Sequence, residues 1–164
     1  MISSYNIYIR HLLALVLVCG VSVSAHGQDL KWHSFEDALA IADSTANPIL
    51  VDVWAPWCGW CHKMRSKVYP QLSTELNKHF VLTRLNRDDN RSKISYKTQQ
   101  LSPLQIAQQL RADKTPTVVL LNSKGNYLLH LSGFRKAKTL RPILQFVSSD
   151  AYEYQTFTQF LQKL

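Results

Sequence analysis

Cysteine is scarce in this sequence, which has three cysteines among its 164 residues: Cys19, Cys58 and Cys61. So few cysteines exclude the framework of structural disulfides that stabilises many small exported proteins. Cys19 lies in an apolar N-terminal segment that we expect to be removed. The remaining pair, Cys58 and Cys61, is therefore either a redox couple or part of a set of metal ligands.

The N-terminal segment also lacks a hydrophobic run long enough to span a membrane. Its apolar run, residues 12–23, covers about 12 residues, fewer than the roughly 20 that a transmembrane helix needs. Arg10 precedes this run, and residues 23–25 (Val-Ser-Ala) form a small-residue cleavage pattern. We predict that residues 1–25 are a signal peptide cut after its last alanine. The mature domain, residues 26–164, would then be periplasmic or secreted.

An uncleaved leader that anchors the chain in a membrane is the alternative. Lipidation of Cys19 is disfavoured because Val18 is bulkier than the small residue that bacterial lipoprotein signals usually carry at that place. Export matters for Cys58 and Cys61 because disulfides persist in the periplasm and outside the cell, whereas the cytosol keeps thiols reduced.

Acidic residues are few: 11 Asp and Glu stand against 19 Lys and Arg, which gives a net charge of +8. A basic chain raises the question of nucleic acid, whose phosphates attract Lys and Arg. Here the basic residues are dispersed and carry no recognisable nucleic-acid motif, so we predict a solvated surface and no nucleic-acid partner. Binding of the basic surface to an acidic protein is an alternative that the sequence leaves open.

The composition, 46% hydrophobic and 18% charged, is that of one globular domain. Strand-like apolar runs alternate with segments that have one apolar face, which predicts an α/β fold with a central mixed sheet flanked by helices. The polar residues 86–101 lack a period and are predicted to be a loop or insertion. The expected strands are 31–33, 49–54, 80–85, 117–121 and 127–131, and the expected helices begin near residues 35, 59 (kinked at Pro70), 103, 137 and 152.

The cysteine pair lies where the apolar strand 49–54 gives way to a helix that begins near Gly59. The attacking species in disulfide exchange is a thiolate. Free N–H groups and the helix dipole stabilise negative charge at a helix N-terminus, so we expect Cys58 to be the nucleophile. Cys61, one turn further along, is expected to be more buried and to act as the resolving thiol.

The resolving thiol needs a proton acceptor before it can attack. Asp52 stands six residues before Cys58, toward the end of the buried strand. Burial raises the pKa of a carboxyl group, which suits it to accept a proton near neutral pH. We therefore predict that Asp52 is the base for Cys61, the alternative being an exposed aspartate at the end of the strand.

The stretch W-A-P-W-C-G-W-C, with Asp52 six residues upstream of the first cysteine, resembles the active-site run of thioredoxin. Lys-Thr-Pro-Thr, residues 114–117, is similar to the second signature of that family. By this resemblance Pro116 is cis, and the backbone of Thr115 pairs with the substrate. Gly133, followed by Phe134, resembles the glycine loop that closes the same surface.

The resemblance extends over nearly all of residues 31–164 and implies a thioredoxin-like fold. It implies that Arg84 contacts the buried aspartate, and that Trp57, Gly59 and Trp60 shape the substrate surface and tune the dithiol. The implied function is reduction of protein disulfides by a monomer without a cofactor or metal, with a membrane-bound disulfide reductase as electron donor.

The start C-x-x-C-x-K-M is similar, more narrowly, to exported thioredoxin-related proteins found with bacterial sulfur-oxidation genes. Trp60 departs from thioredoxin, which has proline there, and residues 86–101 are longer than in thioredoxin. These departures bear on the redox potential and on the choice of partner.

Three other functions stay open at this stage. C-G-W-C-H is also the attachment sequence of a c-type haem, with His62 as axial ligand. Zinc could use both cysteines with histidines, although no second ligand pair has zinc spacing. A redox-inert module could use Trp57, Trp60, Pro116 and Phe134 to bind an extended peptide.

Overall fold

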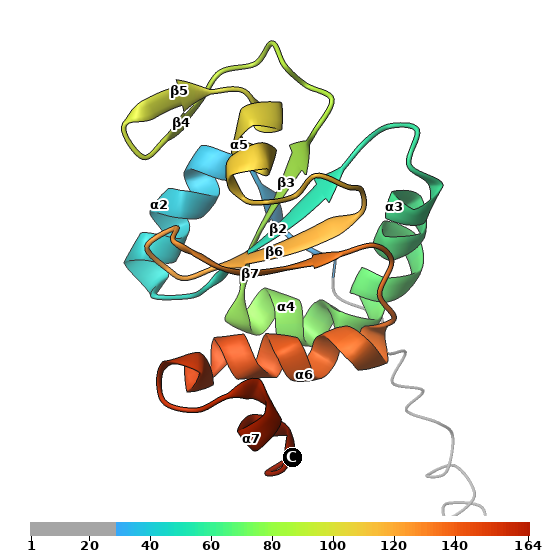
Figure 1. The fold of residues 1–164 in the computed structure, drawn as a ribbon, viewed down its shortest axis with the longest axis vertical. Coiled ribbons are helices and arrows are strands. Elements are labelled where there is room, and N and C mark those ends of the chain that lie inside the picture. Colours follow the sequence, from blue (N-terminus) through green and yellow to red (C-terminus); the bar gives the residue numbers. More distant parts are fainter. Residues whose placement is uncertain (1–28) are drawn as a thin grey trace, which may run out of the picture.

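The computed structural model describes residues 29–164, so the predicted signal peptide and Cys19 lie outside the described residues. A five-stranded mixed sheet runs through the middle of the molecule, with strand order β1-β3-β2-β6-β7 (Figure 1). The prediction of an α/β fold built on a central mixed sheet is confirmed. The strands of this sheet are β1 (Trp32–His33), β2 (Ile49–Trp54), β3 (Val81–Asn86), β6 (Thr117–Leu121) and β7 (Tyr127–Ser132).

Helices cover both faces of the sheet (Figure 1). On one face, α2 (Phe35–Thr45) and α5 (Pro103–Gln109) pack against one group of buried side chains. On the other, α4 (Ser73–His79) and α6 (Ala137–Ser148) pack against a second group, which α7 (Phe157–Leu161) extends. Within residues 29–164, no helix combines the length and the apolar character needed to cross a membrane.

Strand β2 lies in the middle of the sheet and contributes side chains to the hydrophobic cores on both of its faces. Its side chains alternate, so Ile49, Val51 and Val53 join one hydrophobic core while Leu50 joins the other. Asp52 shares the parity of Leu50, and the strand therefore directs its carboxylate toward the face that α4 and α6 cover. β2 pairs in parallel with β3 and antiparallel with β6.

The helical segment after β2 changes its winding along its length. It begins as α3 (Gly59–Lys63), widens to a π-helix over Met64–Val68, and tightens to a 3₁₀-helix over Tyr69–Leu72 before α4 begins. The predicted kink at Pro70 coincides with the 3₁₀ turn, because proline has no N–H for the helix ladder. This winding leaves Met64, Val68 and Tyr69 buried.

Residues 86–101 were predicted to be a loop or insertion, and the prediction of a loop was wrong for the second half of this range. Two short antiparallel strands, β4 (Ile94–Tyr96) and β5 (Gln99–Leu101), form a separate hairpin there. Tyr96 and Leu101 are buried in the core beside α2 and α5. Strands of three residues are too short for their alternation to be recognised among polar neighbours. The turn between them places Lys97 at φ 54°, and lysine is not a residue from which a left-handed turn is predicted.

The other boundaries differ by a few residues from those predicted. β3 extends to Asn86, and α6 extends to Ser148. The last predicted helix divides into a 3₁₀ turn over Ala151–Glu153 and α7, whose start is set by a capping box between Thr156 and Gln159.

Candidate active site

Cys58 and Cys61 form a disulfide at the start of α3. Cys58 is the N-cap of this helix, and its Sγ atom accepts a hydrogen bond from the backbone N–H of Cys61 at 3.1 Å. The two residues are 4% and 1% exposed, so both are nearly buried in this disulfide state. The position predicted for Cys58 at a helix N-terminus is confirmed, and the backbone N–H that contacts its sulfur would also stabilise a thiolate there.

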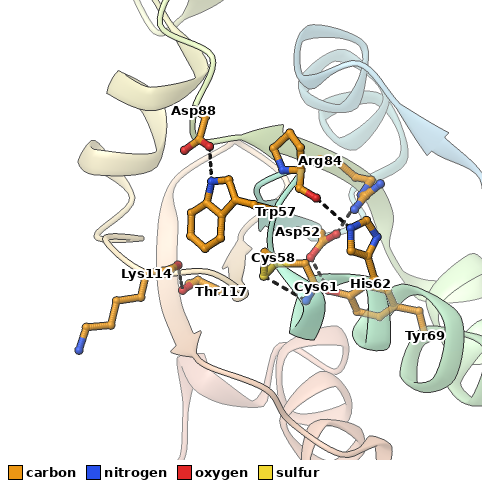
Figure 2. Close-up of a disulfide and its surroundings, with 11 residues drawn as sticks. Asp52, Trp57, Cys58, Cys61, His62, Tyr69, Arg84, Asp88, Lys114 and Thr117 are labelled. Carbon is orange, nitrogen blue, oxygen red and sulfur yellow. Dashed lines mark hydrogen bonds and ion pairs between the residues drawn. A yellow bond between two sulfur atoms is a disulfide. The ribbon is translucent and has the colours of Figure 1, made fainter.

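Asp52 lies at the centre of a buried polar network (Figure 2). Tyr69 donates its hydroxyl hydrogen to Oδ1 at 2.8 Å, and Arg84 donates from Nε to Oδ2 at 2.9 Å. Burial raises the pKa of Asp52 above its ordinary value, while the charge of Arg84 and then the Tyr69 hydrogen bond act against this rise. Asp52 is therefore a carboxyl group that holds its proton to higher pH than an exposed aspartate does.

Arg84 reaches Asp52 because the two residues are register partners in the parallel pair of β2 and β3. Its guanidinium lies between two indole rings, 4.6 Å from the centroid of Trp54 and 5.5 Å from that of Trp32. The rings hold the planar group in place and shield it from water. The Asp52–Arg84 contact implied by the sequence resemblance is confirmed.

Tyr69 is the member of this network that the sequence did not reveal. It lies 17 residues after Asp52 and is fully buried by the winding of the helical segment. Burial, and next the negative charge of Asp52, raise the pKa of Tyr69 well above its ordinary value, so it stays protonated and remains a donor. No motif distinguishes such a tyrosine from one that only fills a core.

Two exposed tryptophans flank the disulfide. Trp57 is 69% exposed and donates from Nε1 to the Asp88 carboxylate at 2.6 Å (Figure 2). Trp60, between the cysteines, is 55% exposed and packs against Phe134 with ring centroids 5.0 Å apart. Both tryptophans therefore offer apolar surface to a partner. Sequence reasoning missed Asp88, which stands in a polar loop where nothing links it to Trp57.

Gly59 is the first residue of α3, and a Cβ atom added there would meet no other atom within 4 Å. Packing inside the protein therefore does not require glycine at this position. An added side chain would instead project into the open space beside the disulfide, where a substrate would approach.

The loop from Lys114 to Pro116 lies at the same end of the sheet as the disulfide. The Thr115–Pro116 peptide bond is cis, as the resemblance implied. Thr117, the next residue, pairs with Val53 near the end of β2 and with Ser132 at the end of β7. These pairings bring Thr115, Pro116 and Gly133 beside the segment that leads to Cys58.

Gly133 closes this end of the site through its backbone. Its N–H donates to the carbonyl oxygen of Pro116 at 2.7 Å, and its φ of 82° is one that favours glycine. Among residues 29–164, the backbone N–H and carbonyl of Thr115 form no backbone–backbone hydrogen bond. The predicted site residues are thus brought together at one edge of the molecule, with Thr115 able to pair with an added strand.

The haem and zinc alternatives fit this geometry poorly. Thioether attachment of a haem would use both sulfur atoms that here bond to each other, and His62 Nε2 lies 3.0 Å from the carbonyl oxygen of Pro56. In the part of the chain that the structure describes, no group of three His, Cys, Asp or Glu side chains is placed to hold a metal ion.

Replacing Asp52 with asparagine should change how the stability of the oxidised protein depends on pH. Because the native pKa of Asp52 is raised from 3.8, the native state holds this proton to higher pH than the unfolded chain. Wild-type stability is therefore lost as pH rises from 3.8 through the native pKa. The free energy of unfolding of Asp52→Asn minus that of wild type should become more positive over this window and then level off. Urea unfolding at a series of pH values measures this difference; a constant or falling difference would contradict the raised pKa.

Comparison with known proteins adds three findings. The family model for thioredoxin-like domains matches residues 35–148. The chain is 44% identical over 43 residues to the thioredoxin of Pyropia yezoensis, an alignment that covers 26% of this chain and 39% of that thioredoxin. The chain thus spans about two fifths of the length of this curated relative.

Solved structures match over a larger share of the chain. A thioredoxin-fold protein from Helicobacter pylori has a TM-score of 0.58 at 19% identity, covering 73% of this chain and 80% of that one. A thioredoxin from Thermus thermophilus has a TM-score of 0.58 at 24% identity, covering 73% and 88%. At these identities the likeness shows the fold alone. Because the family model matches most of the chain, this protein belongs to the family of thioredoxin-like domains.

Proposed function

We propose that this protein is a thiol–disulfide oxidoreductase that reduces disulfides of other proteins. The observation that carries this proposal is the Cys58–Cys61 disulfide, which caps a helix beside a buried carboxyl group. A structural disulfide that closes a loop of so few residues adds little stability, because its benefit grows with the length of the closed loop. A redox role accounts better for a disulfide at this place.

The proposed cycle begins with the reduced protein. The Cys58 thiolate attacks one sulfur of a substrate disulfide, a bond forms between Cys58 and the substrate, and the other substrate sulfur leaves as a thiolate that takes a proton from water. Cys61 then gives its proton to Asp52 and attacks the Cys58 sulfur. The Cys58–substrate bond breaks, the second substrate sulfur leaves as a thiolate that takes a proton from water, and Asp52 returns its proton to solvent. The protein disulfide has formed, and two electrons have passed to the substrate.

The substrate surface in this proposal lies between the two tryptophans and the cis-proline loop. An extended substrate segment would pair with the backbone of Thr115, whose N–H and carbonyl groups form no backbone–backbone hydrogen bond within residues 29–164. The rings of Trp57 and Trp60 would contact the residues that flank the substrate cysteine, and the open space over Gly59 would leave room for them. Pro116 and Gly133 would hold the loop in shape.

The place of action is part of the same proposal. With residues 1–25 removed as a signal peptide, the protein would act in the periplasm or outside the cell as a monomer. It would need a reductant there, and a membrane-bound disulfide reductase is the proposed donor of electrons. The narrower kinship with exported proteins of the sulfur-oxidation type rests on the C-x-x-C-x-K-M start and is proposed with it.

Replacing Cys61 with serine should trap the reaction halfway. The reduced Cys61→Ser protein should accumulate a mixed disulfide between Cys58 and a substrate protein, because no second thiol is present to release it. The matched variant, Cys58→Ser, should form no such adduct. Non-reducing electrophoresis and mass spectrometry measure both. An adduct in the second variant alone would reverse the two roles, and none in either would favour the redox-inert binding module.

Replacing Asp52 with asparagine should also slow the second step. Loss of a general base costs about 100-fold or more, so substrate release after the mixed disulfide should slow by about that factor. Tyr69→Phe keeps the carboxylate and should keep most of the rate. Its pH profile should move to higher pH, because removal of a donated hydrogen bond raises the pKa of Asp52 further. Single-turnover kinetics across pH measure both variants; an unchanged rate in Asp52→Asn would exclude the proton-acceptor role.

The direction of electron flow is tested by the reduction potential of the Cys58–Cys61 pair. Equilibration with glutathione buffers, followed through tryptophan fluorescence, should give a value near the roughly −270 mV of thioredoxin. A value near the roughly −120 mV of strong periplasmic oxidants would make the protein an oxidase. An absorbance scan of the same samples serves as the control for bound haem.

A further inference from the structure

A groove lies between the helical segment that follows Cys61 and the start of α6. Its volume is about 280 Å³, enough for a few side chains. Its apolar members come from both sides of the groove. The lining residues are Lys67, Val68, Gln71, Phe134, Lys136, Ala137 and Lys138.

Phe134 joins this groove to the dithiol. Its ring lines the groove and also packs 5.0 Å from the ring of Trp60, the residue between the two cysteines. The ammonium group of Lys63 lies over this pair, 4.8 Å from the Trp60 centroid and 5.4 Å from that of Phe134. A chain bound at the disulfide could therefore continue into the groove without leaving the surface.

All charged residues of the groove are lysines. Lys67, Lys136 and Lys138 are exposed, as is Lys63 at the junction with the dithiol, and none of the described residues that line the groove carries a carboxylate. The ion pairs found within residues 29–164 use Arg84, Lys124 and Arg141, so none of these four ammonium groups is neutralised by a carboxylate.

Such a cluster repels itself, and this repulsion is relieved when a negative partner binds. Asp88, an acid at the dithiol surface, accepts a hydrogen bond from the indole N–H of Trp57 and is not among the residues that line the groove. The floor made by Val68, Phe134 and Ala137 adds room for apolar side chains. The groove thus combines a small apolar floor with a rim whose charged side chains are all positive.

We propose that the groove binds an acidic, extended polypeptide segment that flanks the disulfide of the substrate protein. This inference rests on the proposed function and narrows its substrate class. A polypeptide is the occupant because the groove meets the dithiol at Trp60, and the dithiol acts on cysteines. Asp and Glu side chains of the segment meet the ammonium groups of Lys63, Lys67, Lys136 and Lys138, and steer the encounter at low ionic strength.

The test uses three synthetic peptides that share one internal disulfide and differ only in flanking residues, which are Glu, Gln or Lys. At low salt, the second-order rate constant for single-turnover reduction by the pre-reduced wild-type protein should be about tenfold or more higher for the Glu peptide than for the Gln peptide, and lowest for the Lys peptide. At about 0.5 M salt this preference should largely disappear, because exposed charges are screened. Equal rates for the three peptides at low salt would overturn the proposal.

Charge reversal assigns the preference to the groove. The double variant Lys67→Glu with Lys138→Glu should abolish or invert the preference for the Glu peptide. A glutamate near the start of α6 is favourable for this helix, because it interacts with the positive end of the helix dipole. The matched control, Lys93→Glu with Lys163→Glu, changes net charge equally at exposed sites outside the groove and should retain the preference. If both double variants lost the preference for the Glu peptide equally, net charge alone would determine that preference, and the proposal would be overturned. Thermal unfolding of each variant shows that it is folded.

A binding arm separates failure of the groove from failure of the redox function. Dye-labelled peptides with Glu or Gln flanks but without cysteine are titrated with the oxidised protein, and anisotropy reports affinity with no exchange. Tighter binding of the Glu peptide, lost in the Lys67 and Lys138 double variant, supports the groove even if no peptide is reduced. Reduction of all peptides without any such difference leaves the oxidoreductase standing and excludes the acidic segment.

Discussion

The burial of one carboxyl group, that of Asp52, constrains the structure around it. β2 is an inner strand, so this side chain has no route to water and must find its partners inside the protein. Arg84 supplies a charge from the neighbouring strand, and Tyr69 supplies a hydroxyl from the helical layer. Removal of one partner from such a buried ionic network typically costs about 3–5 kcal/mol, because the remaining charge is left uncompensated.

This network links the sheet to the segment that carries the dithiol. The helix that begins at Gly59 must reach Tyr69 with its hydroxyl aimed at Asp52, and the change from α to π and then to 3₁₀ winding occurs along this stretch. The same helix begins with Cys58. The position of the disulfide and the surroundings of the carboxyl group are therefore set by one continuous element.

The outer surface of the site has a different character from its interior. Trp57 and Trp60 are exposed, and each makes contacts at the surface. Trp57 donates a hydrogen bond to Asp88, and Trp60 packs against Phe134 and Lys63. Beyond Phe134, the described residues that line the groove include three lysines and no acid. In the proposed cycle, the interior network would accept a proton from Cys61, and the exposed aromatic and basic surface would select the chain that reaches the sulfur atoms.

The sequence by itself determined the sheet and the place of the dithiol at a helix start, because these depend on local patterns such as the apolar run of β2 and the C-x-x-C pair after it. It determined the cis-proline and the Asp52–Arg84 pair only through family resemblance. The tertiary structure alone decided the role of Tyr69, the Trp57–Asp88 contact, the β4–β5 hairpin and the gathering of lysines beside Phe134. Each of these joins residues whose proximity is produced by chain packing, and no local periodicity or spacing encodes it.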